Sequence, residues 1–154
     1  MSTSHGSTVA GDESVVQTRS EGRILIITLN RPEARNAVNL AVAQGLERAM
    51  KELDQRPELR VAVLAGVGAH FCAGMDLNGF ASGERPWLPE SGFSGLVECR
   101  PTKPLIAAVE GGALAGGLGL ALACDIIIAS ESTFFGLSEV GRGLVAAAGG
   151  LLRL

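Results

Sequence analysis

Short aliphatic and β-branched runs alternate along this chain with stretches of helical length, and this alternation restricts the fold more than any other feature. Residues 24–29 and 60–65 are two such runs, each followed by a turn that contains proline or glycine. The residues between them, 39–56, predict a helix that Pro57 ends. Its apolar face comprises Leu40, Ala43, Leu46, Met50 and Leu53. Strand, helix and strand in this order predict a βαβ unit.

The same pattern returns in the second half of the chain. Residues 104–109 and 126–129 predict buried strands, and the glycine-rich run 114–123 between them has the length of a helix. Residues 79–95 combine glycine, proline, serine and charged residues without a period, which predicts a mobile surface loop. The predicted fold class is therefore α/β with a largely parallel sheet.

Composition narrows the class of protein. With 154 residues, 47% of them apolar, the chain can form one globular domain with a hydrophobic core. Its net charge of −3 disfavours a nucleic-acid partner. Residues 1–14 are polar and lack the apolar centre of a secretory signal, so they predict a disordered tail before a core of residues 15–154. The most apolar run, 111–124, contains five glycines and is shorter than the roughly 20 residues of a membrane-spanning helix.

The cysteines predict a reduced, cytoplasmic protein without a metal centre. Cys72, Cys99 and Cys124 are far apart and lack the spacing of zinc ligands. Cys72 is interpreted as structural.

Three familiar motifs of catalysis or nucleotide binding are incomplete. The turn at 66–71 has Phe71 where a dinucleotide-binding turn needs its third glycine. The run 111–118 has glycine and leucine where a phosphate-binding loop needs lysine and serine or threonine. Neither Ser94 nor Ser138 completes the glycine–serine–glycine turn of a serine hydrolase. The sequence therefore disfavours all three classes.

Two glycine-marked turns, residues 71–77 and 111–117, each follow a predicted strand and lead into a predicted helix. Free backbone N–H groups in such turns can bind an oxygen that becomes negatively charged during a reaction. The glycines could equally serve only to bring strand and helix close together. The spacing alone leaves both interpretations open.

Four ordered segments carry a family resemblance. They are L-N-R-P-E-A-R-N-A (29–37), H-F-C-A-G-M-D-L (70–77), A-A-V-E-G-G-A-L-A-G-G (107–117) and F-G-L-S-E-V (135–140). Together they resemble the signatures of the crotonase superfamily, the enoyl-CoA hydratase/isomerase family. This resemblance implies a crotonase-like fold of repeated ββα units, incomplete at the C-terminus.

The resemblance also implies a site. It assigns the oxyanion hole for an acyl-CoA thioester to the backbone N–H groups of Met75 and Gly116, and it places Ala34, Ala73 and Leu77 along the bound coenzyme A. It implies no cofactor other than coenzyme A as part of the substrate, and it implies a homo-oligomer, based on a trimer in the full-length family members.

Hydratases of the family use two glutamates, and the sequence departs from that pattern. The first position corresponds to Gly119 and the second to Glu139, so efficient hydration is doubtful and proton transfer by Glu139 alone is favoured. The alternative is that Glu139 is a solvated or capping residue. Ala147 occupies the position of the aspartate nucleophile of the dehalogenase branch. Asp76 and Asp125 are interpreted as structural.

The predicted function is that of an enoyl-CoA hydratase/isomerase, a lyase or isomerase of fatty acid metabolism. A non-catalytic acyl-CoA binding protein and an inactive truncated subunit are the alternatives. Apolar surface left uncovered by the missing family helices would favour assembly or aggregation.

Overall fold

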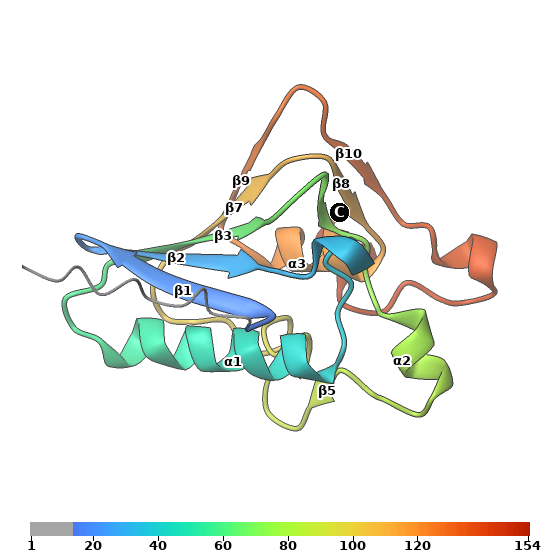
Figure 1. Cartoon of the computed structure of the whole chain (residues 1–154), viewed down its shortest axis with the longest axis horizontal. Helices are drawn as coiled ribbons and strands as arrows, with labels where there is room; N and C mark the ends of the chain where they lie inside the picture. Colours follow the sequence, from blue (N-terminus) through green and yellow to red (C-terminus); the bar gives the residue numbers. More distant parts are fainter. Residues whose placement is uncertain (1–13) are drawn as a thin grey trace, which may run out of the picture.

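The structure is a computed structural model that describes residues 14–154. Its largest element is a five-stranded sheet. Its order is β1 (Val16–Glu21), β2 (Ile24–Leu29), β3 (Val61–Gly66), β7 (Leu105–Val109) and β9 (Ile126–Ala129), as Figure 1 shows. Only β1 pairs antiparallel, and the other strands are parallel. The predicted parallel sheet is therefore confirmed. The predicted tail, residues 1–14, lies outside the described residues apart from Ser14.

A second, parallel sheet of three short strands stands beside the first. It contains β10 (Phe134–Gly136), β8 (Gly112–Leu114) and β4 (His70–Cys72), in that order. Each of its strands follows a strand of the main sheet along the chain. The predicted βαβ unit is present, because β2 and β3 are parallel and the helix of residues 40–55 connects them. The short strands β4, β8 and β10 extend the repeat to two strands followed by a helical turn, and they were not predicted because three-residue strands carry too little periodicity to be seen in the sequence.

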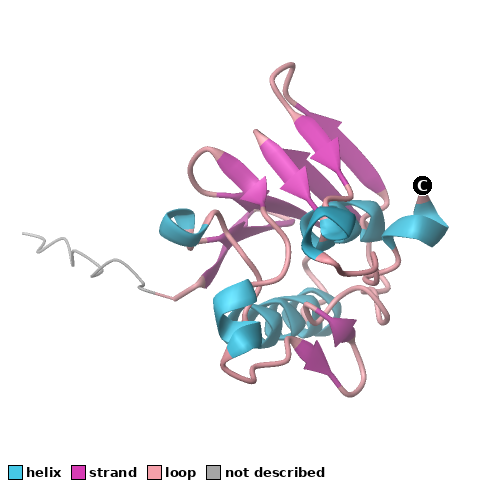
Figure 2. Ribbon diagram, turned by 90° about the vertical axis from the view of Figure 1, so that its right-hand side faces the viewer, coloured by secondary structure: helices cyan, strands magenta, loops and turns pink. Residues whose placement is uncertain are grey.

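Helix α1 (Leu40–Gln55) covers one side of the main sheet, with the small hairpin of β5 (Trp87–Leu88) and β6 (Gly92–Phe93) beyond it (Figure 2). Asn39 caps its first turn by accepting a hydrogen bond from the Val42 amide at 3.0 Å. The predicted apolar face is buried except for Leu40, which is half-buried. On β2 the alternating residues Leu25, Ile27 and Leu29 are buried as well, so helix and sheet share one core.

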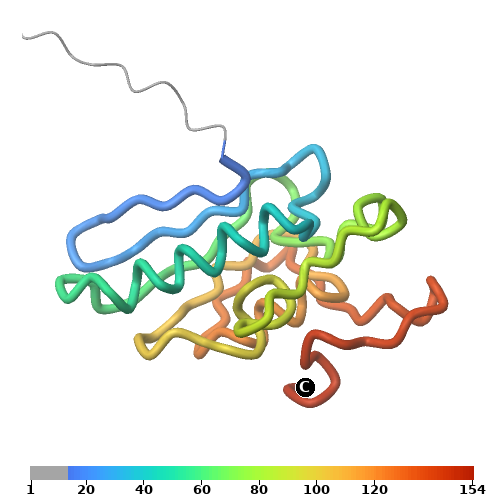
Figure 3. The backbone as a smooth tube through the Cα atoms, turned by 90° about the horizontal axis from the view of Figure 1, so that it is seen from below, coloured from blue at the N-terminus to red at the C-terminus, as the bar shows by residue number. Residues whose placement is uncertain are grey.

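The remaining helical elements are short apart from α3. They are η1 (Pro32–Ala34), α2 (Leu77–Ala81), α3 (Gly116–Ala123), η2 (Glu139–Arg142) and α4 (Gly150–Arg153). Helix α3 is almost wholly buried and contacts β4 and β8. Figure 3 shows residues 137–154, in red, projecting from the same end of the molecule as α2.

The prediction that residues 79–95 form a surface loop is wrong for the second half of that segment. Residues 79–81 end α2, and β5 (Trp87–Leu88) pairs with β6 (Gly92–Phe93) in a small antiparallel hairpin. Phe93 and Leu96 are buried. The glycines and prolines of this segment favour a loop, so the hairpin could not be predicted from the sequence. The buried side chain of Phe93 holds it against the core.

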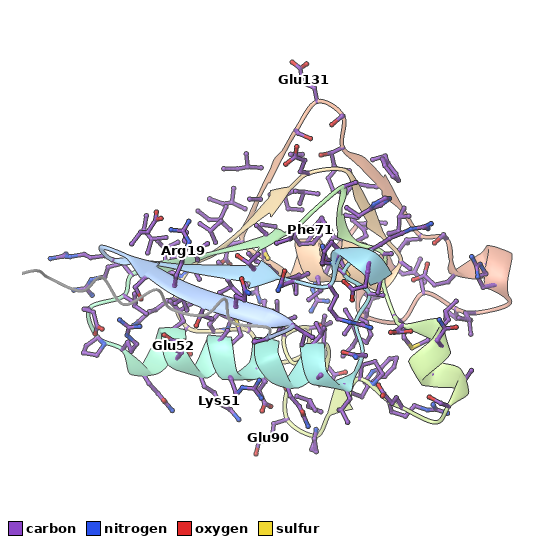
Figure 4. The ribbon with its side chains drawn as sticks, viewed as in Figure 1. Arg19, Lys51, Glu52, Phe71, Glu90 and Glu131 are labelled. Atoms are coloured by element: carbon purple, nitrogen blue, oxygen red, sulfur yellow. The ribbon has the colours of Figure 1, made fainter. Side chains whose placement is uncertain are left out.

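Exposed apolar side chains gather on the last strands. Ile126 and Ile128 of β9 and Phe134 and Phe135 of β10 are all exposed. Figure 4 contrasts Phe71, inside the fold, with Glu131, at the tip of the loop between these two strands. Within residues 14–154 no helix is long and apolar enough to cross a membrane.

Candidate active site

One cavity of about 250 Å³ lies where α2, the β5–β6 hairpin, the start of α3 and residues 138–148 meet. Its lining is mainly apolar and includes three aromatic rings. The lining residues are Ala73, Met75, Leu77, Phe80, Trp87, Phe93, Ala115, Gly116, Ser138, Glu139, Arg142, Leu144, Val145, Ala147 and Ala148. An apolar cavity with a few polar groups is typical of a small-molecule site.

The turn after β4 leaves the Met75 amide free. Val38 donates its N–H to the Gly74 carbonyl at 2.7 Å, and Asp76 donates its N–H to the Val38 carbonyl at 2.9 Å. The intervening Met75 amide points the other way because successive amides of extended chain alternate in direction. Within the described part of the chain, it has no hydrogen-bond acceptor.

The first amide of α3 is free as well. The initial N–H groups of a helix have no acceptor in the preceding turn, and Ala115 at the N-cap offers no side-chain cap. Ala115 instead has a strained backbone, with φ 51° and ψ −123°, and its own N–H donates to the Gly136 carbonyl at 2.7 Å. Among residues 14–154 the Gly116 amide finds no acceptor, so the structure offers a second free donor.

The glycines bring these two amides together. A Cβ atom on Gly74 would lie 3.0 Å from the Gly116 nitrogen, and Gly74 also has a φ of +95°. A Cβ on Gly116 would lie 2.6 Å from the ring of Phe93, and one on Gly117 would overlap the Cys72 carbonyl oxygen. The glycines therefore do bring strand and helix close together, which was one of the two interpretations of the sequence. The same close approach makes the two free amides neighbours.

Side chains behind the turn fix it in place. Arg31 pairs with Asp76 through an Nη2–Oδ2 distance of 3.0 Å, with side chains only 16% and 15% exposed. Asp76 also accepts from the amides of Asn78 and Gly79, which confirms its structural role at the start of α2. Burial opposes ionisation of this carboxyl group, but hydrogen bonds from Gly79 and Arg31 outweigh it and lower the pKa of Asp76 below its ordinary value.

Asn36 is a second support that the sequence analysis missed. Its side chain is 1% exposed and donates to the carbonyls of Val67, at 2.9 Å, and His70, at 2.8 Å. Its Oδ1 accepts from the Arg31 amide at 2.9 Å. Both Asn36 and Arg31 lie in the first segment of the family resemblance, residues 29–37. Neither composition nor periodicity indicates that an asparagine there is buried with a φ of +55°.

Cys72 is structural, as predicted. Its thiol donates to the Asn36 carbonyl at 3.1 Å, and its sulfur accepts from the Gly74 amide at 3.4 Å. Burial raises the pKa of this thiol to about 12. Asp125 is structural too, although it caps no helix: its Oδ2 accepts from the Leu105 amide at 2.8 Å and links the starts of β7 and β9.

Glu139 supplies the carboxylate of the cavity. It begins η2, and its Oε2 is buried without a hydrogen-bond partner among the described residues. A carboxylate oxygen that is buried and unpaired costs free energy, which is typical of a group that meets a ligand. The residue as a whole is half-buried, so the buried oxygen favours a role in the cavity over a fully solvated side chain.

Gly119 lies in α3 beneath the segment that follows η2. A Cβ atom on Gly119 would lie 2.8 Å from the carbonyl oxygen of Ala148 and 2.9 Å from its Cβ. Ala148 thus occupies the space next to the helix where a longer side chain would have to pass. Ala147, which excludes the aspartate nucleophile, lines the cavity nearby.

The structure brings together five of the six predicted site residues. Met75, Gly116, Glu139, Ala73 and Leu77 all line the one cavity. Ala34 does not; it ends η1, and its neighbour Arg35 accepts a hydrogen bond from the Ala73 amide at 3.0 Å. Residues 14–154 contain no group of three or more histidine, cysteine or acidic residues that could hold a metal ion.

Comparison with known proteins gives a consistent result. Residues 19–154 match the family described as enoyl-CoA hydratase/isomerase. The chain is 45% identical to the mevalonyl-coenzyme A hydratase of Aspergillus fumigatus, over 85% of this chain and 50% of that protein. It is 44% identical to the carnitinyl-CoA dehydratase of Salmonella enteritidis, over 92% of this chain and 55% of that protein.

Solved structures agree on the fold. The enoyl-CoA hydratase EchA1 of Mycobacterium marinum superimposes with a TM-score of 0.90 and 55% identity, covering 92% of this chain and 56% of that one. The predicted α/β fold with repeated ββα units is thereby confirmed. The chain spans about half the length of the curated relatives it matches.

Proposed function

We propose, because this chain belongs to the enoyl-CoA hydratase/isomerase family, that its cavity binds an acyl-CoA thioester and stabilises the enolate formed from it. The thioester oxygen would accept hydrogen bonds from the amides of Met75 and Gly116. Coenzyme A, as part of the substrate, would extend past Ala73 and Leu77 toward Ala34, and no other cofactor takes part.

One observation carries this proposal: two unpaired backbone amides and one unpaired carboxylate oxygen line the same apolar cavity. Donors that are already oriented toward a developing negative charge need not reorganise during the reaction. Removing one such donor typically slows catalysis by about 100-fold to 1000-fold.

Glu139 would act as the only acid and base. It takes the proton from C2 of a 3-enoyl thioester; the electrons of that C–H bond form a C1–C2 double bond, and the carbonyl pair moves to the thioester oxygen. Glu139 then returns the proton to C4, which bonds through the C3–C4 pair, while the C1–C2 pair becomes the C2–C3 double bond and the oxygen pair reforms the carbonyl of the 2-enoyl thioester. Each proton and electron pair is accounted for without a further reagent, and Glu139 ends in its starting state.

Hydration by two carboxylates is disfavoured at this site. Gly119 offers no carboxylate, and the backbone of Ala148 lies against it. A missing general acid or base typically costs about 100-fold to 10,000-fold in rate. Isomerisation needs only one proton carrier, so it is the reaction that the lining residues support best.

The relatives support the substrate class. Two of them are named for reactions on a coenzyme A thioester, mevalonyl-CoA and carnitinyl-CoA. We propose in addition that the whole protein acts in fatty acid metabolism, as a cytoplasmic homo-oligomer based on a trimer.

The test is proton NMR in deuterated water with a 3-enoyl-CoA. Double-bond migration with deuterium at C2 and little 3-hydroxyacyl product supports isomerisation by one base. Much hydroxyacyl product shows that water is activated despite Gly119. No reaction favours a non-catalytic acyl-CoA binding protein or an inactive subunit.

A variant assigns the base. Glu139→Gln should lower deuterium exchange at C2 by at least about 100-fold while acyl-CoA affinity changes less than about threefold. Glu131→Gln makes the same change at an exposed loop and should exchange like the parent chain. Equal exchange in both variants contradicts the role of Glu139.

A further inference from the structure

Arg142 is the one cation among the described residues that line the cavity. Of the described lining residues, only Glu139 and Arg142 carry ionisable side chains; six others are aromatic rings, leucines or a valine. Arg142 is exposed, and within residues 14–154 it has no ion pair or hydrogen bond. A guanidinium group without a partner inside a binding cavity is available to a ligand.

The helical turn that carries Glu139 also sets the direction of Arg142. Both residues belong to η2, a 3-10 helix, in which side chains three positions apart lie on the same side. The rise of such a helix separates them by about 6 Å along its axis. No ion pair joins them, so Arg142 does not neutralise the carboxylate of Glu139.

The charge of this side chain makes the site selective. Trp87, Phe93 and Leu144 line the same cavity, whereas Arg142 itself is exposed. A charge-assisted hydrogen bond from guanidinium to a carboxylate is stronger than a hydrogen bond between neutral groups. A trimethylammonium group in the same place would be repelled.

We propose that Arg142 forms a subsite for a carboxylate at the far end of the acyl group, so that the preferred substrates are coenzyme A monothioesters of short dicarboxylic acids. The proposal rests on the cavity being an acyl-CoA site. Because Glu139 and Arg142 lie one 3-10 turn apart, a short acyl chain with C2 at Glu139 would bring its terminal carboxylate toward the guanidinium.

The experiment is calorimetric titration with two thioesters of equal chain length, glutaryl-CoA and pentanoyl-CoA. Neither undergoes double-bond migration, so the measurement reports binding alone. The parent chain should bind glutaryl-CoA about tenfold or more tightly than pentanoyl-CoA. Arg142→Gln should abolish that preference, and its affinity for pentanoyl-CoA should change less than about twofold.

Two further variants complete the test. Arg142→Lys should keep part of the preference, because an ammonium group retains the charge but not the two-point contact with a carboxylate. Arg48→Gln makes the same charge change on the exposed face of α1, away from the cavity, and should keep the whole preference.

The outcomes separate this inference from the proposed function. If both thioesters bind with equal affinity to the parent chain, or if Arg48→Gln and Arg142→Gln weaken glutaryl-CoA equally, the subsite is overturned while the acyl-CoA site stands. If neither thioester binds, both proposals are overturned.

Discussion

The two walls of the cavity differ in how firmly they are held. The amide wall, residues 31–38, 72–76 and 112–119, contains the Arg31–Asp76 ion pair, the buried side chain of Asn36 and glycines with no room for a Cβ. The base wall, residues 137–150, carries Glu139 on a single 3-10 turn, and Val145 beside it is 81% exposed.

This difference matches the two kinds of chemistry. Hydrogen-bond donors stabilise a developing charge only if they are fixed beforehand, and a displacement of about 1 Å can cost about 100-fold in rate. A base that moves a proton between two carbons has to reach both of them. If the proposed roles hold, the donors lie at the start of the buried helix α3 and in the turn before α2, whereas the base lies on the short 3-10 helix η2.

Thiol labelling should show the largest contrast between the walls. In a Cys99→Ser background, Cys72 reports on the amide wall, and an added Val145→Cys reports on the base wall. Because the pKa of Cys72 is raised to about 12, its reactive thiolate is nearly absent at pH 8, and Cys72 should react about a thousandfold more slowly than the new cysteine.

Mass spectrometry after reaction with iodoacetamide measures both rates, and denaturant should make them similar. The buried thiol of Cys124, with a pKa also raised to about 12, serves as an internal reference. Rapid labelling of Cys72 in the folded chain would show that the amide wall opens readily.

The same substitution on each wall gives the next contrast. An alanine Cβ at Gly117 would overlap the Cys72 carbonyl oxygen, whereas one at Gly141 would meet nothing within 4 Å. Gly117→Ala should lower the free energy of unfolding by about 3 kcal/mol and isomerisation by about 100-fold. Gly141→Ala should leave both nearly unchanged. Urea unfolding measures the stability and the NMR assay measures isomerisation. Equal effects of the two substitutions would show that the two walls are held equally firmly.

Arg31→Met should have an intermediate effect. It leaves the half-buried Asp76 carboxylate without its cation, at a cost of about 2 kcal/mol in stability, and it loosens the Met75 amide. We expect a fall in kcat of about tenfold with little change in KM, whereas Arg48→Met on α1 should change neither. A change in KM alone would mean that Arg31 serves binding.

The pH dependence of stability checks the same ion pair. The folded pKa of Asp76 is lowered from 3.8, so its contribution to stability is present above about pH 4 and is lost as the pH falls through the folded value. Arg31→Met removes one cause of that shift, and its stability should depend less steeply on pH below 4. Equal slopes for both proteins would contradict this account.

The elements that could be predicted from the sequence are those with a regular spacing of apolar residues or a complete motif. The helix at 39–56 and four strands of the main sheet follow from apolar runs and side-chain spacing. The glycines mark the two turns at 71–77 and 111–117, and the resemblance selects Met75 and Gly116 within them. The short strands β4, β8 and β10 and the anchoring of Phe93 depend on contacts between distant segments. Asn36 acts through three hydrogen bonds to backbone that no local pattern reveals.

Hydrogen exchange should give the smallest but most local contrast. Amides of α3 lie in a buried helix, whereas residues 140–149 form the end of η2 and the exposed or half-buried turns after it. Arg153 ties this segment to the core by donating to the Val97 carbonyl at 2.8 Å. Arg153→Gln should therefore raise exchange in residues 140–149 by about threefold and leave α3 unchanged, at a cost below about 1 kcal/mol in global stability. Faster exchange in α3 as well would mean that the two walls open together, and the base would then be as firmly held as the donors it works beside.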